Sequence, residues 1–405
     1  MEKKKKEEFD FKKFESEALE QLRSGKKLEG KDGILAPLIK RLVEAGLNGE
    51  MNAHLTGAKR INRRNGKTGK QVKTAFGKVD IQTPRDRQGD FEPQLLPKRQ
   101  TTLGEALDHK VISLYSMGMS YNDICKHLEE LYGLDVSPAT LSTITDSVIE
   151  EVNAWRNRPL ESVYPFMWLD AIHYKVKQDG AIKTKAVYCL LGVNREGIKD
   201  LLGLYISENE GARFWLSVMT DIQNRGVKDI LIACIDNLKG FAEAIESVFP
   251  HTEVQLCIVH QIRNSTKYVS NKDIKAVIKS LKEIYEAPNK EQAERGLLML
   301  EERWAKPYPM MVKSWFNNWE RLSNYLKYPQ EIRKIIYTTN IIESFHSQLR
   351  KVTKSKRVFS SDMSLFKLLY LVQKNLKDDW QGPMRYWRQT YAQMMILFED
   401  RMNQE

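Results

Sequence analysis

Three carboxylates are the residues in this sequence best placed to do chemistry, and two of them follow short apolar runs. Asp236 comes directly after residues 230–235, and Asp170 comes directly after residues 163–169. Runs of this length, rich in β-branched or aromatic residues, are typical of buried strands. An acid in this position can simply cap the helix that follows. If both strands belong to one sheet, however, the two carboxylates can converge on a cation.

The third carboxylate, Glu343, lies in the segment TTNIIESFHSQLRK. The apolar residues of this segment have helical spacing, and Thr339 or Asn340 can cap the helix. Glu343 falls in the first turn, where a carboxylate suits the positive end of the helix dipole. Taken alone it can be a solvated surface residue, but with Asp170 and Asp236 it would complete a set of three acids.

A set of three carboxylates suits metal-assisted chemistry at a phosphodiester. Hard oxygen ligands favour Mg²⁺ or Mn²⁺. Two such ions, roughly 3.5 to 4 Å apart, can assist both the attacking and the leaving oxygen of an in-line displacement. We expect the sheet to hold Asp170 and Asp236, and a helix to bring Glu343 to them.

A zinc site is not expected, although Cys257 and His260 form a CxxH pair. The pair supplies half of a tetrahedral ligand set, and the other histidines have no matching spacing. We expect Cys257 to be a core residue that points off its strand. His260, at the end of that strand, would contact DNA or support the acids.

The elements around the acids predict a mixed sheet. Residues 230–235, 241–249 and 254–259 read as strand, helix and strand, a unit that normally places its strands parallel. Before it, residues 171–176 and 185–193 flank the turn Asp179-Gly180 as strands of a meander. Residues 201–207 would add a third strand, and residues 211–225 an amphipathic helix.

These motifs closely resemble the Mutator-type transposases of bacterial insertion sequences. The resemblance covers nearly the whole chain from about Leu35 and rests on DNLKGF followed by AEAIESVFPHTEVQLCIVHQIRNS, on WLDAIHYKVK, on EGARFWLSVMTDIQNRGVKDILIACID and on YTTNIIESFHSQLRKVTKS. Two positions depart from the family pattern: Asn237 stands where glycine is common, and His346 where asparagine is common.

The resemblance implies a ribonuclease-H-like core with an Asp-Asp-Glu triad at Asp170, Asp236 and Glu343 and a two-metal site for Mg²⁺ or Mn²⁺. It also implies binding to the terminal inverted repeats of an element, strand cleavage and strand transfer into target DNA. Holding two DNA ends together favours a homodimer or larger synaptic assembly. The alternative is a DNA-binding protein, derived from such a transposase, that has lost catalysis.

Composition agrees with a DNA-binding protein. Of the 405 residues, 64 are Lys or Arg and 53 are Asp or Glu, giving a net charge of +11 that favours a polyanionic partner. The four cysteines include no CxxC pair, which fits a reducing cytoplasm. The family resemblance implies a bacterial, nucleoid-associated location. Since no apolar run is long enough to span a bilayer, we expect no membrane insertion.

Two regions are predicted to contact DNA in the first part of the chain. Residues 59–98 are basic and rich in turns, with a short hairpin formed by residues 72–76 and 78–83 around Gly77. Its phosphate-binding candidates are Lys59, Arg60, Arg63, Arg64, Lys67, Lys70 and Lys73. Residues 116–152 have helix-turn-helix spacing, and their second helix would offer Thr140, Ser142 and Thr143 to base edges. Residues 59–98 can instead be a solvated loop, and residues 116–152 can be a pair of helices that does not bind DNA.

The predicted fold is therefore multidomain α+β. We divide it into a charged arm (1–33), a DNA-binding region (34–158), the first part of the core (159–261), an all-helical insertion (262–335) and a last part (336–405) that carries Glu343 and two C-terminal helices. A further basic surface beside the acids would contact DNA through His260, Arg263, His346, Arg350, Lys351 and Lys354.

Overall fold

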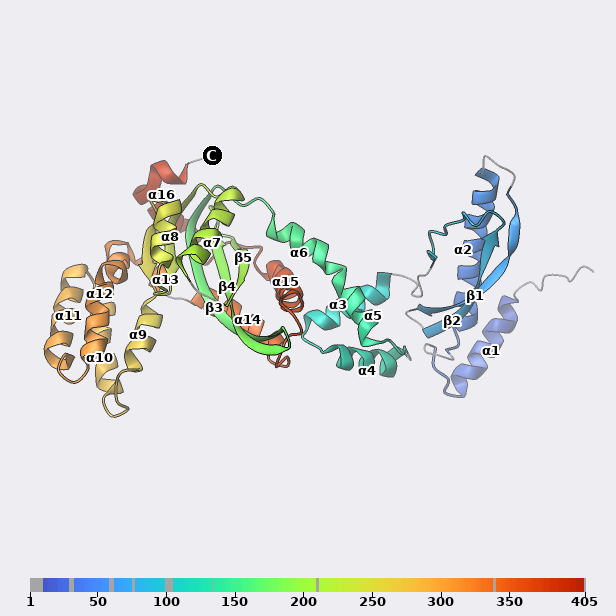
Figure 1. The fold of residues 1–405 in the computed structure, drawn as a ribbon, viewed down its shortest axis with the longest axis horizontal. Coiled ribbons are helices and arrows are strands. Elements are labelled where there is room, and N and C mark those ends of the chain that lie inside the picture. The colour runs from blue at the N-terminus through green and yellow to red at the C-terminus, as the bar shows by residue number, and fades with distance from the viewer. Residues whose placement is uncertain are drawn as a thin grey trace, which may run out of the picture. The chain divides into compact units, whose positions relative to one another are not determined.

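The computed structural model describes residues 10–28, 33–57, 62–74, 77–98, 105–132, 134–208, 211–337 and 340–403. The chain forms two compact units, Met1–Ser147 and Val148–Glu405. Figure 1 shows the helices and strands of each unit, which are described in turn.

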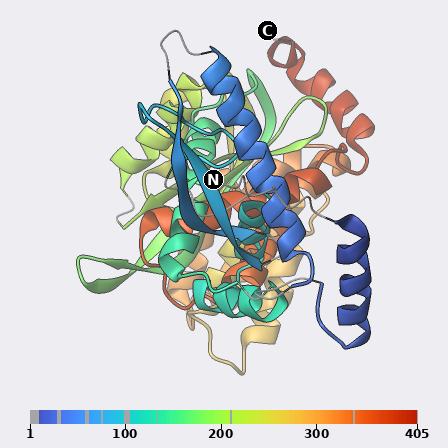
Figure 2. The ribbon, with the colours of Figure 1, turned by 90° about the vertical axis from the view of Figure 1, so that its right-hand side faces the viewer.

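The first unit begins with two helices and a hairpin. Helices α1 (Phe11–Arg23) and α2 (Ala36–Gly57) precede the antiparallel strands β1 (Arg64–Thr74) and β2 (Gly77–Asp86). Helix α2 packs along the hairpin (Figure 2). Their shared core consists of Val43, Leu47, Val72, Val79, Ile81 and Leu96. The strands are longer than the sequence predicts, since β1 begins at Arg64, β2 ends at Asp86, and the two strands pair over this length.

Three further helices complete this unit: α3 (Glu105–Ser116), α4 (Tyr121–Tyr132) and α5 (Pro138–Asp146). Helix α5 has the predicted cap, since the Ser137 hydroxyl accepts the Thr140 N–H at 3.1 Å and Pro138 occupies the first turn. The predicted second helix does not run on to residue 152. It ends at Asp146, and α6 (Val148–Arg156) follows. At the break, the Ser147 hydroxyl donates to the carbonyl of Ile144 at 2.7 Å, a bond that competes with the helical ladder.

The second unit is built on a five-stranded mixed sheet in the order β5-β4-β3-β6-β7. Figure 1 labels three of these strands, β3, β4 and β5. Its strands are β3 (Val163–Gln178), β4 (Ala181–Val193), β5 (Lys199–Ser207), β6 (Asp229–Ile235) and β7 (Glu253–Leu256). Strands β3, β4 and β5 are antiparallel neighbours, while β6 is parallel to β3 and β7 is parallel to β6. Asp179 and Gly180, with φ of 49° and 78°, form the tight β3–β4 turn.

Two strand boundaries differ from the sequence-based prediction. Residues 163–169 and 171–176 form one strand, β3, so Asp170 lies inside a strand and pairs with Cys189 of β4. The strand continues because β4 pairs with it far beyond the point where β6 stops. Strand β7 in turn ends at Leu256, and helix α9 (Ile258–Thr266) starts directly after Cys257. The Cys257 sulfur accepts the N–H of His260 at 3.4 Å, so His260 belongs to a helix and not to a strand end.

Helices surround the sheet. Helix α7 (Ala212–Asn224) buries Trp215, Val218, Met219 and Ile222, as its spacing predicts, and α8 (Phe241–Val248) lies between β6 and β7 in the chain. From residue 258 to residue 337 the chain is helical apart from its turns: α9, α10 (Ile274–Tyr285), α11 (Lys290–Trp304), α12 (Pro309–Ser323), a 3₁₀ turn at Asn324–Lys327, and α13 (Gln330–Tyr337). Helices α14 (Asn340–Thr353), α15 (Asp362–Asp379) and α16 (Trp387–Met402) complete the unit.

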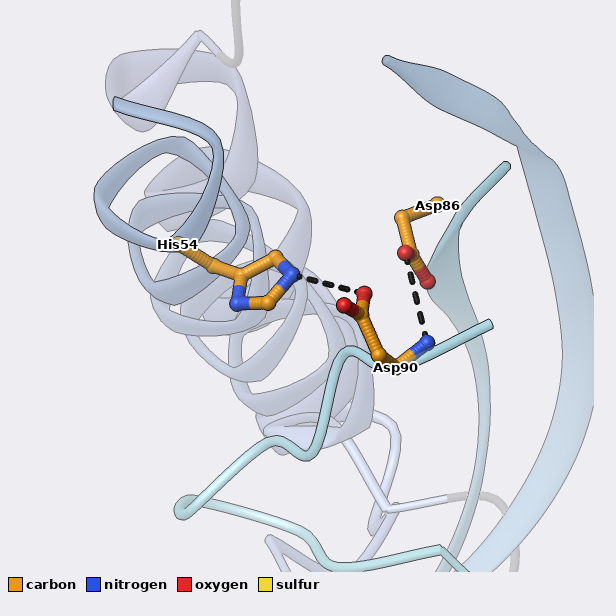
Figure 3. Close-up of side chains that lie close together, drawn as sticks. All are labelled: His54, Asp86 and Asp90. Atoms are coloured by element: carbon orange, nitrogen blue, oxygen red, sulfur yellow. Dashed lines mark hydrogen bonds and ion pairs between the residues drawn. The ribbon is translucent and has the colours of Figure 1, made fainter. Parts of the chain in front are cut away.

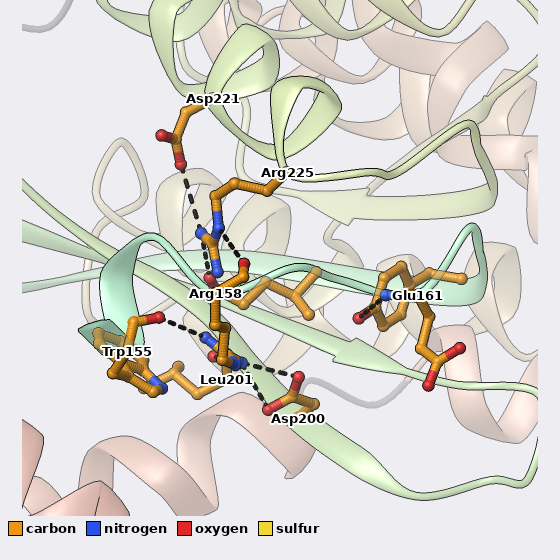
Figure 4. Close-up of polar contacts among 9 residues, drawn as sticks. Trp155, Arg158, Glu161, Asp200, Leu201, Asp221 and Arg225 are labelled. Atoms are coloured by element: carbon orange, nitrogen blue, oxygen red, sulfur yellow. Dashed lines mark hydrogen bonds and ion pairs between the residues drawn. The ribbon is translucent and has the colours of Figure 1, made fainter. Parts of the chain in front are cut away.

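Two arginines fasten α6 and α7 to the edge strand β5 (Figure 4). Arg158 donates to both carboxylate oxygens of Asp200 at 2.8 Å and to the carbonyl of Leu201 at 2.8 Å. Arg225 donates to the Leu202 carbonyl of β5 at 2.7 Å and to the Arg158 carbonyl at 3.0 Å. These bonds join segments that have no backbone ladder in common, and they fix the point where the chain enters the sheet.

We expect Arg158→Ala to lower the free energy of unfolding of the second unit by about 2 kcal/mol, because the variant loses the bonds to the Asp200 carboxylate and the Leu201 carbonyl, and bonds to charged groups are stronger than neutral ones. Urea unfolding followed by tryptophan fluorescence would measure the loss. The matched control is Lys183→Ala, which removes an exposed ion pair with Glu208 and should cost less than about 1 kcal/mol. Equal losses in the two variants would contradict the anchoring role of Arg158.

Candidate active site

Asp170 and Asp236 occupy equivalent positions on neighbouring strands. The last paired residues of β3 and β6 are Leu169 and Ile235, and each acid is the next residue of its chain segment. The Ala171 N–H donates to Asp170 at 2.8 Å, and the Asn237 N–H donates to Asp236 at 2.7 Å. One oxygen of each carboxylate is therefore oriented by the backbone, and both acids lie where the parallel pairing of β3 and β6 ends.

The electrostatic setting of Asp170 favours a bound cation. Its side chain is 15% exposed. Burial is the main cause that raises the pKa of the Asp170 carboxyl, with His260 and the Ala171 N–H opposing the rise and the charges of Asp236 and Glu343 adding to it. Because several negative charges gather in a partly desolvated place, a cation bound there would relieve their repulsion.

A histidine accompanies each aspartate. His346 Nδ1 lies 3.5 Å from Asp170 Oδ2, and His260 Nδ1 lies 3.8 Å from Asp236 Oδ1. Within the described residues, neither His346 Nε2 nor His260 Nδ1 has a hydrogen-bond partner. Burial, helped by the charges of Arg350 and His260, lowers the pKa of His346 to about 4, so this ring is neutral at pH 7.

The position of His346 differs from the sequence-based expectation. Its side chain is 2% exposed and faces Asp170, so in this conformation it offers no surface to DNA. Glu343 and His346 are three residues apart on α14, a spacing that puts two side chains on one helix face. This spacing was the available signal that His346 accompanies the acids.

Glu343 is held by an arginine rather than joined to the aspartates. Arg263 Nη2 lies 2.7 Å from Glu343 Oε1, and the two side chains are 58% and 33% exposed. Within the described residues, the oxygens of the three acids do not all lie within 4.8 Å of one another. The structure thus places one histidine beside each aspartate and an arginine beside Glu343.

The loop after Asp236 depends on a glycine. The Leu238 N–H donates to the carbonyl of Asp236 at 2.8 Å, and Gly240 has a φ of 79°. A Cβ on Gly240 would meet the Ala212 Cβ at 3.1 Å. Asn237, which departs from the family pattern, is not among the residues with positive φ, so asparagine fits its position without strain.

A second polar cluster, which the sequence-based reasoning missed, lies in the first unit (Figure 3). His54 Nε2 is 3.2 Å from Asp90 Oδ1, and Asp86 is buried beside them. In the described part of the chain, only these three residues bring three potential metal ligands within 4.8 Å. Asn62 donates to Asp86 at 2.8 Å and to Asp90 at 3.2 Å, and the N–H groups of Asp90 and Phe91 donate to Asp86.

These hydrogen bonds account for the cluster without an ion. Burial by itself would raise the pKa of Asp86, but the bonds from Asn62, Asp90 and Phe91 outweigh it and hold the pKa below its ordinary value. Asp86 thus stays ionised and closes the loop that follows β2. His54 is distant in sequence from the two aspartates, and the spacing of Asp86 and Asp90 matches no known metal motif. No local pattern therefore predicts their contact.

The predicted DNA-binding residues are placed as follows. Arg63, Arg64 and Lys67 are exposed at or near the start of β1, but Arg64 donates to Asn48 at 2.7 Å and to Asn52 at 2.6 Å. Lys70 donates to the Pro97 carbonyl at 3.1 Å. On α5, Thr143 is exposed and Thr140 and Ser142 are half-buried. Arg350 and Lys351 are exposed near the end of α14, and Lys354 is exposed just after it. Lys59, Arg60 and the side chain of Lys73 lie outside the described residues.

The cysteines and helices add two findings. All four cysteines are free thiols, and burial raises the pKa of Cys257 to about 12, which makes it a poor metal ligand at neutral pH. No helix within the described residues has both the length and the apolar character needed to cross a membrane.

The family and the three relatives described next are all transposases. The family described as "Transposase, Mutator family" matches residues 11–382. The chain is 44% identical over 397 residues to a transposase for insertion sequence element ISRM3 of Rhizobium meliloti (strain 1021), covering 96% of this chain and 99% of that protein. It is also 44% identical to a probable transposase for an ISRM3-like element of Sinorhizobium fredii, with the same coverage. A transposase for element IS905 of Lactococcus lactis is 32% identical over 76% of this chain and 78% of that protein.

Proposed function

This chain belongs to the Mutator family of transposases, and on that premise we propose that it cuts DNA at the terminal inverted repeats of an insertion sequence and joins the ends to target DNA. We assign Asp170, Asp236 and Glu343 as its Asp-Asp-Glu triad. The observation that carries this assignment is the placement of Asp170 and Asp236 at equivalent positions of β3 and β6.

The order of the sheet supports a ribonuclease-H-like core. Three antiparallel strands are followed by two parallel ones, and β3, which carries the first acid, is central. Asp236 follows the neighbouring strand, and helices α9 to α13 separate it from Glu343. An all-helical insertion between the second and third acids is what the sequence-based reasoning predicts.

The donor set fits Mg²⁺ or Mn²⁺. It consists of carboxylate oxygens, and the thiol of the nearby Cys257 is protonated. Burial raises the pKa of Asp170, and the charges of Asp236 and Glu343 add to that rise. Two such cations, when bound, would favour both the attack and the departure of oxygen at a phosphate in an in-line displacement.

The residues of the chain would perform the remaining tasks. The N–H groups of Ala171 and Asn237 orient the two carboxylates, and the rings of His346 and His260 restrict their rotation. The same site would then let the 3′-hydroxyl freed by cleavage attack a target phosphodiester, displacing the 3′-oxygen of the target strand. No covalent bond to the protein is needed in either step.

DNA binding is assigned to the first unit and to the basic end of α14. Helices α4 and α5 would act as the helix-turn-helix pair, with Thr143 and its neighbours toward base edges. Strand β1 would contact phosphates through its exposed basic residues. Because two element ends must be held together, the working form would be a homodimer or a larger assembly.

We expect Arg63→Ala and Arg64→Ala to differ, although both remove a predicted phosphate contact. Each should flatten the dependence of log affinity on log salt by about one unit. Arg64→Ala should also destabilise the first unit, because Arg64 bonds to Asn48 and Asn52. Fluorescence anisotropy at several salt concentrations and thermal unfolding would measure the two effects. Unchanged salt slopes in both variants would remove these residues from the DNA interface.

The experiment that tests the proposed function is cleavage of a labelled duplex carrying the element's terminal repeat, with Mg²⁺ or Mn²⁺ against EDTA, for the wild type and Glu343→Gln. We expect metal-dependent cutting at the repeat boundary that the variant lacks. Binding without cutting, under conditions in which a related active enzyme cuts, would favour the catalytically silent DNA-binding alternative.

A further inference from the structure

The contact between Arg263 and Glu343 joins two helices at the edge of the candidate active site. Arg263 comes from α9, one turn after His260, and Glu343 comes from the first turn of α14. Their side chains meet at 2.7 Å although they are eighty residues apart in sequence. The contact bridges the segment that follows the second acid and the helix that carries the third.

The pair is accessible and can exchange partners. Arg263 is 58% exposed, and the ion pair is therefore screened by water and salt. A guanidinium has five N–H donors and recognises phosphate in the same forked geometry that it uses for a carboxylate. A DNA phosphate near α9 would compete for the groups that now bind Glu343.

The same contact affects what Glu343 can do. A carboxylate whose oxygen accepts a short hydrogen bond from a guanidinium is a weaker ligand for a cation, because its negative charge is already partly neutralised. This agrees with the spread of the three acids, whose oxygens, all among the described residues, do not gather within 4.8 Å.

We propose that Arg263 is a positioning residue that couples DNA binding to completion of the metal site. In the DNA-free protein Arg263 holds Glu343 away from full coordination. When a DNA phosphate takes the guanidinium, Glu343 is released to join Asp170 and Asp236. This proposal rests on the proposed function, since it assumes that the three acids bind a divalent cation.

The test is a Mn²⁺ titration of the full-length, DNA-free protein, with free Mn²⁺ measured by electron paramagnetic resonance. Only binding that Asp170→Asn abolishes is counted, which excludes other sites. We expect Arg263→Gln to bind Mn²⁺ about fivefold more tightly than the wild type, the size expected for removal of one exposed ion pair. The matched control is Lys267→Gln, which removes one charge from the residue that caps the end of α9, bonds to Asn264 instead of Glu343, and should leave the affinity unchanged.

A double-mutant cycle makes the test specific. In the Glu343→Gln background, Arg263→Gln should no longer change the Mn²⁺ affinity. Weaker binding in Arg263→Gln would mean that the arginine orients Glu343 for coordination, and unchanged binding would mean that the pair has no influence; either result overturns the proposal. If Asp170→Asn abolishes no binding, the metal site itself fails, and the proposed function fails with it.

The predicted contact between Arg263 and DNA is tested separately, by the salt dependence of DNA binding. We expect Arg263→Gln to flatten the salt dependence of binding to the terminal-repeat duplex by about one unit, as for the loss of one phosphate contact. An unchanged slope, even with tighter Mn²⁺ binding, would overturn the coupling, because Arg263 would then not be taken by DNA.

Discussion

Asp170→Asn is expected to lower the rate of strand cleavage by about 10³-fold while leaving DNA affinity nearly unchanged. The amide keeps the shape of the side chain and can still accept the Ala171 N–H. It loses the negative charge, and metal-assisted charge stabilisation contributes several kcal/mol to such reactions, which corresponds to a rate factor of about this size. Single-turnover cleavage of the terminal-repeat duplex in Mg²⁺ and in Mn²⁺, together with anisotropy, would measure both quantities.

The matched control for this variant is Asp179→Asn at the tip of the same hairpin. Asp179 has a positive φ, a conformation that asparagine tolerates well, so the control removes one carboxylate from β3–β4 without strain. It should cleave like the wild type. If Asp170→Asn keeps wild-type cleavage, or if the control loses as much activity, Asp170 is not part of the triad.

The sheet was predictable because its information is local. The runs before Asp170 and Asp236 are short and apolar, and both are buried strands in the structure. Asp179-Gly180 is a turn signal that needs no knowledge of distant residues, and the helix expected at residues 241–249 ends within one residue of the end of α8 at Val248. The spacing of apolar residues indicates which face of a helix or strand is buried, and these elements were predictable because each of them has such a buried face.

The surroundings of the acids were less predictable because they depend on contacts between distant segments. Helical spacing puts His346 beside Glu343, but only packing of α14 against β3 decides that this face meets Asp170. The Arg263–Glu343 pair likewise joins segments separated by the whole helical insertion. The sequence identified Arg263 as basic and near the acids, yet a charge pattern alone cannot tell a phosphate contact from an ion pair.

The same limit applies in the first unit. A dense cluster of basic residues before Gly77 predicts phosphate contacts, but Arg64 is already bonded to two asparagines of α2. Asp86 looks like an ordinary strand-end acid and is instead the acceptor that closes a loop. The partners of each charged residue within the protein therefore have to be known before that residue is assigned to a DNA interface.

Gly240→Ala is expected to reduce cleavage by about 10²-fold and to lower the free energy of unfolding by about 1–2 kcal/mol. Gly240 has a left-handed backbone conformation, which costs an L-residue with a Cβ about that much. The new Cβ would also press on Ala212 at the start of α7, at 3.1 Å. The loop has to shift, and since Asp236 is bonded into the same turn, its carboxylate shifts too; a misplacement of about 1 Å can cost a factor of this size.

Gly211→Ala is the matched control for the loop. Gly211 immediately precedes Ala212, has an extended backbone, and has open space where its Cβ would be. This variant adds the same methyl group to the residue beside Ala212, where it meets no neighbour. It should keep wild-type cleavage and lose less stability than Gly240→Ala, since its cost is limited to that of alanine at a helix N-cap. Both variants would be compared by single-turnover cleavage and urea unfolding. Full cleavage in Gly240→Ala, with its stability lowered, would mean that the turn supports the fold but does not position Asp236.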